Sequence, residues 1–278
     1  MKYVRLNGSE HASELEKVRL QMSLEGGLNE EEFSQLEVSM LIAFVSNTVP
    51  ATFWVLYDLY SRPQLLDEIR KEMEANALSI KTDSTYHVDI AAIRGNCPLL
   101  LSTFQEVLRT RGAASPMRFI MKDTLLAGKY LLKAGNIVNL PSDPIGHQPE
   151  VWGDTADTFD ERRFMRPVTS DNKLDTKKDP RRTGGFMPFG ISPVICPGRH
   201  FASSEILGLV AMMVLRYDIE PVCGAWVEPR KNSWSIVSLM GAVKDKFPVS
   251  VKQRKIYEGV NWDFEVHEGK GQFPLVIG

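Results

Sequence analysis

Cysteine is scarce in this 278-residue sequence, which contains only Cys97, Cys196 and Cys223. The count is odd and no two of them have Cys-x-x-Cys spacing. Neither a disulfide framework nor a zinc site is indicated, and a reducing compartment is expected. An excess of either charge is also missing, because 33 Lys and Arg residues balance 35 Asp and Glu residues, for a net charge of -2. The charge therefore does not favour nucleic acid or an anionic membrane surface as the main partner.

A signal peptide is not expected either, since no apolar run follows the first five residues. A long apolar stretch, residues 38–60, is interrupted by polar residues and a proline: Ser46, Asn47, Thr48, Pro50, Thr52 and Asp58. Polar groups at mid-bilayer are costly, so this stretch is predicted to be a long buried helix and not a membrane span. Hydrophobic residues make up 43% of the chain, which is enough for a sizeable core.

Periodicity and chain breakers predict a mainly helical chain with a small β region. Helices are expected at residues 9–24, 29–60, 64–77, 98–109 and 198–216, the second of them capped by Asn29 with acids in its first turn. Short apolar runs predict strands of a small sheet at residues 119–121, 124–126, 130–132 and 137–140, and further strands at 234–243 and 247–251. Residues 141–195 show little periodicity, and so long an irregular stretch is often functional. Residues 255–278 form a tail without a clear pattern.

One segment combines cysteine with glycine and proline. Residues 186–202 form a loop dense in Gly and Pro that leads to Cys196, and an apolar helix is predicted to follow at once. The positive end of a helix dipole and its unpaired N–H groups favour a thiolate at that position. Gly198 is expected to let the backbone turn closely, and Phe189 to pack beside the sulfur. The alternative is a buried structural cysteine, the commonest fate of a lone cysteine.

The whole segment resembles the haem-binding loop of the cytochrome P-450 superfamily, F-G-x-G-x-R-x-C-x-G-R-x-F-A. The matching residues are Phe189, Gly190, Cys196, Gly198, Arg199, Phe201 and Ala202. Ser192 stands where the family usually has Gly, and Val194 where it usually has an Arg that binds a haem propionate. The resemblance implies one haem b whose iron is ligated by the Cys196 thiolate, with Phe189 and Gly198 as further haem-site residues.

Two further segments resemble the family's motifs in the right order. Glu106 and Arg109 lie three apart on one predicted helix face and can pair, which alone is a weak signal. Residues 159–164 resemble the family's F-x-P-E-R-F, and residues 147–152 its H-x-D-P-E-x-W. The resemblance implies that Glu106, Arg109 and Arg163 form one buried structural network that fixes the cysteine loop. Arginine suits this role because its planar fork pairs with carboxylates through two bonds.

Basic residues are expected to act at two places near the haem. Arg118 aligns with a position that the family often uses for a haem propionate, and the alternative is a strand-edge arginine in solvent. A basic loop precedes the cysteine loop: Lys177, Lys178, Arg181 and Arg182. It is predicted to dock an acidic redox partner, and the alternative is a solvated loop that keeps the chain soluble.

The apolar stretch at residues 38–60 also carries a motif. Pro50 cannot donate to the carbonyl of Ser46, so the helix is expected to open locally, and an ordinary proline kink is the alternative. Residues 43–50 resemble the family's oxygen-side helix, A-G-x-D/E-T-T, with Asn47 and Thr48 at the two threonine positions. The resemblance implies that they and a water relay protons to bound oxygen. Asn followed by Thr resembles the branch of cholesterol 7α-hydroxylase and prostacyclin synthase, which contains both oxygen-inserting enzymes and isomerases.

The resemblance covers about residues 20–254 and corresponds to the rear half of a family chain. It implies a mainly α fold with a small β region, truncated at the N-terminus, with a haem domain at residues 1–254 and a tail of unknown role at 255–278. The implied activity is that of a haem-thiolate monooxygenase. It would oxidise an apolar small molecule, sterol-, lipid- or secondary-metabolite-like, with O2 and electrons from an NADPH-dependent reductase.

Two alternatives to this activity stay open at the level of sequence. One is a haem-dependent isomerase, which needs no reductase. The other is a truncated, catalytically silent product, motivated by the missing front half. By family analogy the protein would associate with the endoplasmic reticulum membrane. The chain shows no membrane anchor, which leaves a cytosolic location open.

Overall fold

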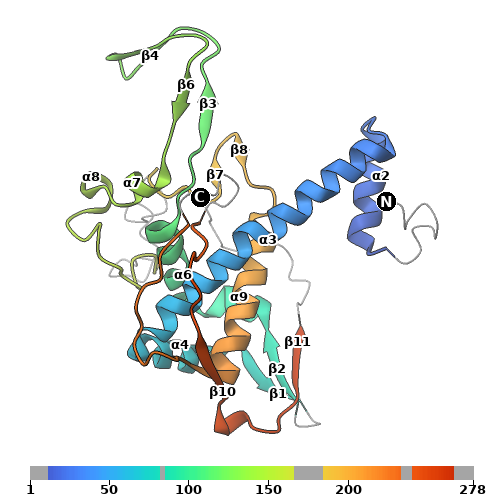
Figure 1. Ribbon diagram of the computed structural model, residues 1–278, viewed down its shortest axis with the longest axis vertical. Helices are drawn as coiled ribbons and strands as arrows, with labels where there is room; N and C mark the ends of the chain where they lie inside the picture. The colour runs from blue at the N-terminus through green and yellow to red at the C-terminus, as the bar shows by residue number, and fades with distance from the viewer. Residues whose placement is uncertain (1–11, 82–84, 166–183, 233–239, 266–278) are drawn as a thin grey trace, which may run out of the picture. The chain divides into compact units, whose positions relative to one another are not determined.

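The computed structural model describes residues 12–81, 85–165, 184–232 and 240–265 (Figure 1). The chain divides into two compact units, Met1–Asn47 and Thr48–Gly278, which are described separately. Helix α3 (Glu30–Tyr60) contributes residues to both units. Helices dominate the described chain and strands are short, so the predicted mainly α fold with a small β region is confirmed.

The first unit contains α2 (Glu14–Glu25) and the beginning of α3. Asn29 caps α3 as predicted: its Oδ1 accepts the amide N–H groups of Glu31 and Glu32 at 2.9 and 3.0 Å. The Glu32 carboxylate in turn accepts the N–H of Asn29 at 2.8 Å, which completes a reciprocal capping box. Arg19 on α2 donates to the carboxylate of Glu37 on α3 at 2.6 and 3.0 Å and so joins the two helices.

Helix α3 continues through Pro50 without an interruption. The expected local opening therefore does not break the helix, although Pro50 has no N–H for the Ser46 carbonyl. By length and composition α3 could cross a membrane, because its most apolar window has a mean hydropathy of 1.5 and only 28% of that window is buried.

The prediction of burial along all of residues 38–60 is wrong for the first part. Leu41 and Val45 are 65% and 60% exposed, whereas Trp54 and Val55 are fully buried. The apolar pattern indicates a helix, but burial also requires elements that pack against it, and the pattern does not carry that information.

The core of the second unit is helical. It combines the end of α3 with α4 (Pro63–Asn76), α5 (Ile90–Asn96), α6 (Pro98–Arg111) and α9 (Arg199–Arg216). Helix α9 packs against α4 and α5, and α6 packs against the same two helices. Each helix contributes a fully buried apolar side chain to this core: Trp54, Ile69, Ile93, Leu100 and Leu207. Helix α9, which follows the cysteine loop, is therefore held by a continuous apolar core.

Local sequence explains where α4 and α6 begin. Pro63 and Pro98 occupy their first turns, where a missing N–H costs no hydrogen bond. The start of α6 is also capped from α4, since the Glu72 carboxylate accepts the N–H groups of Leu99 and Leu100 at 2.8 and 3.0 Å. This cap fixes the helix that carries the Glu106 and Arg109 pair.

The β structure is made of short, separate pieces. The strands are β1 (Leu78–Ile80), β2 (Tyr86–Asp89), β3 (Met117–Phe119), β4 (Thr124–Leu126), β5 (Tyr130–Leu132), β6 (Ile137–Asn139), β7 (Gly190–Ile191), β8 (Val194–Ile195), β9 (Tyr217–Pro221), β10 (Val249–Gln253) and β11 (Trp262–Glu265). One sheet has three strands in the order β1-β2-β11, with β11 parallel to β2. The pairs β3–β6, β4–β5, β7–β8 and β9–β10 are two-stranded and antiparallel. Short helical turns complete the described elements: α7 (Ser142–Gly146), α8 (Pro149–Trp152) and η2 (Lys255–Tyr257).

The predicted small sheet at residues 119–140 is therefore wrong as a single sheet. A tight turn at Ala127 and Gly128, both with positive φ, pairs β4 with β5, while β3 pairs separately with β6. Within the predicted strand at 234–243, residues 234–239 lie outside the described part, and Met240 and Val243 form isolated bridges. Several elements were not predicted: β1, β2, β7, β8, β9, β11, α5, α7, α8 and η2.

Two buried groups predict that the fold weakens at alkaline pH. Burial raises the pKa of the Cys97 thiol from 9.0 and that of the Tyr60 hydroxyl from 10.0, each to about 12, and the charge of Glu72 adds to the shift of Cys97. When the pKa of an acidic group is higher in the folded state than in the unfolded state, its contribution to stability is fully present below the unfolded-state pKa. That contribution is lost as the pH rises toward the folded-state pKa. The free energy of unfolding should therefore fall between pH 9 and 12, by at most about 1.4 kcal/mol per pH unit for each group.

Denaturant unfolding at a series of pH values measures this slope. Cys97→Ala should flatten it, whereas the same change at the exposed Cys223 should leave it unaltered. An equal slope in wild type and Cys97→Ala would show that the buried thiol ionises as easily in the folded chain as in the unfolded one.

Candidate active site: a cysteine loop and its supporting network

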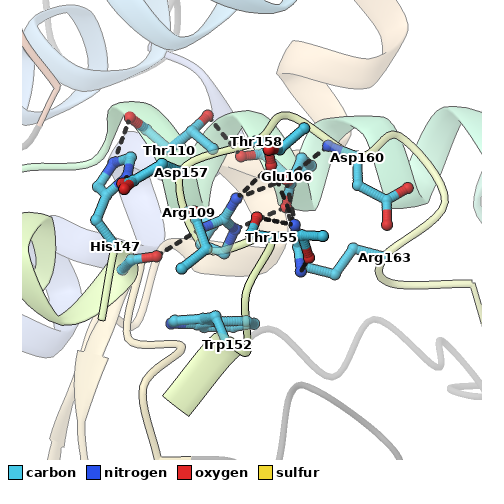
Figure 2. Close-up of polar contacts among 12 residues, drawn as sticks. Glu106, Arg109, Thr110, His147, Trp152, Thr155, Asp157, Thr158, Asp160 and Arg163 are labelled. Atoms are coloured by element: carbon cyan, nitrogen blue, oxygen red, sulfur yellow. Dashed lines mark hydrogen bonds and ion pairs between the residues drawn. The ribbon is translucent and has the colours of Figure 1, made fainter. Parts of the chain in front are cut away.

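A buried ion pair on α6 lies at the centre of the supporting network. Glu106 and Arg109 have no exposed side-chain surface and pair through two bonds, 2.7 Å from Arg109 Nη2 to Glu106 Oε1 and 2.8 Å from Arg109 Nε to Glu106 Oε2 (Figure 2). Arg163 adds a second guanidinium, with its Nε 3.2 Å from both carboxylate oxygens. The structure thus brings the three predicted residues together.

The same arginines hold an irregular segment, residues 155–160. Arg109 donates to the carbonyls of Ala156 and Thr158 at 2.7 and 3.2 Å, and also to that of Gly146. Arg163 donates to the carbonyls of Thr155 and Thr158, and the N–H of Asp160 donates to Glu106 at 2.9 Å. Because buried charges are costly unless their bonds are all made, this network fixes the path of the backbone around it.

Two residues of the segment 147–152 extend the network, although no contacts were predicted for them. His147 lies with Nδ1 3.0 Å from Asp157 and Nε2 3.3 Å from the carbonyl of Thr110 (Figure 2). Trp152 donates from Nε1 to the carbonyl of Ile145 at 3.0 Å, and the guanidinium of Arg109 lies 5.2 Å from its ring centre. Their placement next to the ion pair could not be read from a motif alone.

A chain of contacts leads from this network toward the cysteine loop. The N–H of Phe164, next to Arg163, donates to the buried hydroxyl of Ser102 on α6 at 3.0 Å. The ring of Phe164 packs against that of Phe186 at 4.6 Å between centres. Phe186 begins the segment that carries the cysteine, and both rings are buried. The network therefore contacts the segment that carries the cysteine loop through the packed rings of Phe164 and Phe186.

The cysteine loop is a tight hairpin. Strands β7 and β8 pair around a turn that contains a cis Ser192–Pro193 bond. Gly190 has a φ of 92°, and a Cβ there would lie 2.9 Å from the carbonyl of Val194, so glycine is required. The N–H of Cys196 donates to the carbonyl of Phe189 at 2.8 Å, which closes the hairpin just before α9 begins.

The residues around the thiol leave it accessible. Cys196 is exposed, so the alternative of a buried structural cysteine is wrong. Gly198 does not make an unusual turn, because its φ of -80° suits any residue. A Cβ at Gly198 would lie 3.9 Å from Cys196 Sγ, so glycine instead keeps space open beside the sulfur. Phe189 packs partly buried against the core.

Arg118 reaches the cysteine hairpin from β3. Its Nη2 donates to the carbonyl of Ile191 and lies 3.4 Å from that of Ser192, in the turn of the hairpin. It is therefore not simply a solvated strand-edge arginine. Its guanidinium joins β3 to the loop, and the propionate contact stays a prediction.

The two predicted proton-relay residues lie where the units meet in the sequence. In the first unit, Asn47 donates from Nδ2 to Ser46 Oγ at 3.3 Å. In the second, Thr48 is buried, and its carbonyl accepts the hydroxyl of Thr52 at 2.8 Å. The relay itself stays a prediction. The predicted basic loop, Lys177, Lys178, Arg181 and Arg182, lies outside the described residues.

The donor chemistry around Cys196 fits haem. Within the part of the chain that the structure describes, no three His, Cys, Asp or Glu side chains gather where they could hold a bare metal ion. Iron on a single thiolate needs its other positions filled by a macrocycle, as haem provides. The exposed apolar Val194 and Phe201, from the same hairpin and the first turn of α9, suit a large apolar ligand.

Comparison with known proteins decides the family. The sequence matches Cytochrome P450 over residues 8–247. The chain belongs to the cytochrome P450 family. The cofactor of this family is haem b, and ligation of its iron by the Cys196 thiol stays a prediction.

Several curated relatives resemble this cytochrome P450 chain. The cytochrome P450 monooxygenase nodJ of Hypoxylon pulicicidum is 39% identical over 99% of the chain and 54% of its own length. A cytochrome P450 monooxygenase of Gibberella zeae is 31% identical over 72% of the chain and 38% of its own length. The 7-alpha-hydroxycholest-4-en-3-one 12-alpha-hydroxylase of Oryctolagus cuniculus is 32% identical over 66% of the chain and 38% of its own length. The P450 chain thus spans about half the length of nodJ, and less of the other two.

Proposed function

We propose that this chain is the haem-thiolate part of a monooxygenase that oxidises an apolar small molecule. The observation that carries the proposal is the exposed Cys196 thiol on a tight hairpin, at the head of a helix whose far part is buried in the core. Bound there, haem would supply the activation of O2 for oxygen insertion.

The chain's own residues would hold and shield that group. Cys196 Sγ would ligate the iron, Phe189 packs partly buried against the core, and Gly198 leaves space beside the sulfur. Arg118 would fix the hairpin and face a propionate. The buried network of Glu106, Arg109 and Arg163 would keep the loop in place through Phe164 and Phe186.

Two residues of α3 would take part in proton transfer. Thr48 and Asn47 are proposed to relay protons toward bound oxygen, Thr48 through its hydroxyl and Asn47 through its amide. This assignment rests on the resemblance of their segment to the family's oxygen-side helix. Conversion of Thr48 to alanine would remove one hydroxyl and leave the axial ligand unchanged, so it should affect product yield more than haem content.

Relatives narrow the proposed substrate and partners. The relatives above are named as monooxygenases and as a 7-alpha-hydroxycholest-4-en-3-one 12-alpha-hydroxylase, and these activities favour oxygen insertion over isomerisation. We infer a sterol-, lipid- or secondary-metabolite-like substrate, with electrons from an NADPH-dependent reductase. Association with the endoplasmic reticulum membrane is a further proposal, which rests on the family resemblance.

The chain expressed alone should hold haem weakly and oxidise substrate poorly. Apolar side chains lie exposed on α3 and in the β3–β6 region, including Val49 at 59%, Phe119 at 71% and Met121 at 88%. Exposed apolar surface of this kind usually indicates a missing partner or leads to aggregation. Haem content per monomer after gel filtration should be well below one. The reduced CO complex should nevertheless show the red-shifted Soret band of a thiolate ligand.

The CO difference spectrum and haem content of the purified chain test the proposal together. Coupled oxidation should increase if a second polypeptide that supplies the remaining half of a family chain is co-expressed. One tightly held haem per isolated chain and full coupled oxidation would show that the chain closes its own pocket. Complete absence of a thiolate spectrum under both conditions would support the catalytically silent product instead.

A further inference from the structure

A C-terminal segment, residues 254–265, crosses the end of α9 that is farthest from the cysteine. We name this segment the C-terminal strap. It contains η2 and β11 and lies beyond the residues 8–247 that match the family. In Figure 1, β11 lies beside β2 in the three-stranded sheet. No clear pattern was found in residues 255–278, and no role was predicted for them.

The C-cap residue Tyr217 donates its N–H to the carbonyl of Met213, and four further described hydrogen bonds reach the end of α9 from other elements, two of them from the strap. The last four carbonyls of a helix lack partners within the helix or are only partly satisfied there. In α9 they accept as follows: Met213 from Tyr60 Oη at 2.9 Å, Val214 from Arg70 Nε at 3.0 Å, Leu215 from Arg254 Nη1 at 2.9 Å, and Arg216 from the Arg254 N–H at 2.9 Å. Side chains of α3 and α4 supply two of these bonds, and Arg254 alone supplies the other two.

Arg254 is itself held by α4. Its Nη1 lies 3.0 Å from Glu74 Oε1, and the hydroxyl of Tyr257 donates to the same oxygen at 2.9 Å. Tyr257 is buried, which raises the pKa of its hydroxyl above the usual value and keeps it a donor. The rings of Tyr86 and Trp262 pack against Tyr257 at 5.2 and 5.0 Å between centres. Arg254 is therefore fixed between α4, α9 and the aromatic cluster.

Strand pairing fixes the other end of the strap. The N–H of Tyr86 donates to the carbonyl of Asn261 at 2.9 Å, and β11 then runs parallel to β2. Lys81 pairs with Asp263 at 2.8 Å, and Lys81 lowers the pKa of that carboxyl. The strap thus bridges the β1–β2 hairpin, α4 and the end of α9.

The two ends of α9 are held unequally. Its buried residues run from Ser203 to Leu215, whereas Phe201 in its first turn is 53% exposed. The helix has 18 residues and is about 27 Å long, so a tilt of about 2° at one end moves the other by about 1 Å. A displacement of that size matters for a metal ligand, which must be held within about 0.5 Å. The orientation of the cysteine end therefore depends on the core and on the far end.

We propose that Arg254 and Tyr257 of the C-terminal strap are positioning residues for Cys196. They fix the end of α9, and through the rigid helix they set where the first turn meets the cysteine hairpin. The proposal takes from the proposed function only that Cys196 is the haem ligand. Neither residue contacts the thiol, so both act through α9.

Arg254→Gln and Tyr257→Phe in the full chain test this proposal. Arg254→Gln should raise amide exchange in the last turn of α9 by about tenfold, as expected for lost charge-assisted bonds. In the haem-free chain it should also change the alkylation rate of Cys196 several-fold relative to that of Cys223, an exposed thiol of the same molecule. In the haem-loaded chain it should lower the fraction of the reduced CO complex that keeps a thiolate ligand. Tyr257→Phe keeps the ring, loses only the bond to Glu74, and should show smaller changes in the same direction.

Arg230→Gln is the matched control, because Arg230 also pairs with a carboxylate, Asp245, but lies exposed. It should leave the exchange, alkylation and spectrum unchanged. The proposal would be overturned if Arg254→Gln speeds amide exchange in the last turn of α9 but leaves both the Cys196 alkylation ratio and the thiolate fraction unaltered. That result would show that the strap stabilises the end of α9 without positioning Cys196. If Arg254→Gln does not fold, the same comparison on Tyr257→Phe decides. Absence of thiolate ligation in wild type would instead refute the haem assignment, and the alkylation ratio would still decide on the strap.

Discussion

Replacing Cys196 by serine should abolish the thiolate signal of the reduced CO complex. A thiolate is a strong ligand for haem iron, whereas a serine hydroxyl stays protonated at neutral pH and is a poor iron ligand. Within the described residues no cluster of His, Cys, Asp and Glu stands ready to replace it. The loss of the red-shifted Soret band should therefore be complete, even if some haem stays in the pocket.

Cys223→Ser is the matched control for this substitution. Cys223 is the other exposed cysteine, and its thiol lies 3.2 Å from the carbonyl of Ala225, in a turn outside the hairpin. Its replacement should leave the band and the haem content as in wild type. A red-shifted band that survives in Cys196→Ser would show that a different residue holds the iron and would remove the basis of the proposed site.

Features set by local sequence could be predicted. The Asn29 cap, the prolines at the starts of α4 and α6, and the apolar run of α9 each act within a few residues, so pattern and boundary agree with the structure. The loop before Cys196 was predicted from its Gly and Pro content, but its hairpin of β7 and β8 was not.

Features set by distant partners could not be predicted. β2 is a four-residue strand without strong alternation, and it pairs in parallel with β11 near the other end of the chain. The Arg254 and Tyr257 contacts with Glu74 have the same origin, since nothing local marks these three residues as neighbours. The prediction of burial along α3 was wrong for a related reason, because burial depends on which other elements cover the helix.

The supporting network lies between these two cases. Spacing places Glu106 and Arg109 on one helix face, but only the resemblance to a family motif added Arg163. The roles of His147 and Trp152 were missed. Each contacts a backbone carbonyl, of Thr110 and Ile145 respectively, and a backbone carbonyl carries no sequence signal. The side-chain partner of His147, Asp157, lies in an irregular segment with no helical spacing to reveal it. Side-chain pairs at helical spacing leave a trace in the sequence, whereas distant pairs and contacts to the backbone do not.

Glu106→Ala should be among the most destabilising single changes in this chain. The carboxylate has no exposed surface and neutralises the guanidinium groups of both Arg109 and Arg163. Its removal leaves a fully buried arginine without its counter-charge, which costs about 3–5 kcal/mol of unfolding free energy. Glu106→Gln should recover only part of this loss, because its amide nitrogen would face a guanidinium N–H. Denaturant unfolding measures the loss, and haem content should fall with it.

Two adjacent arginines provide the sharpest comparison for the network. Arg163 is 9% exposed and pairs with Glu106, whereas Arg162 is 46% exposed and pairs with Glu68 and Glu161 at the surface. Arg162→Ala should cost less than about 1 kcal/mol, as exposed ion pairs usually do. Arg163→Ala should cost several times more, and it should also release the segment 155–158, because its Nη2 bonds to Thr155 and Thr158 are lost. Faster amide exchange of that segment in Arg163→Ala, but not in Arg162→Ala, would be the specific result. Equal stability of the two variants, with full haem loading in both, would mean that the carboxylate of Glu106 needs only Arg109 and that the loop is fixed by packing alone.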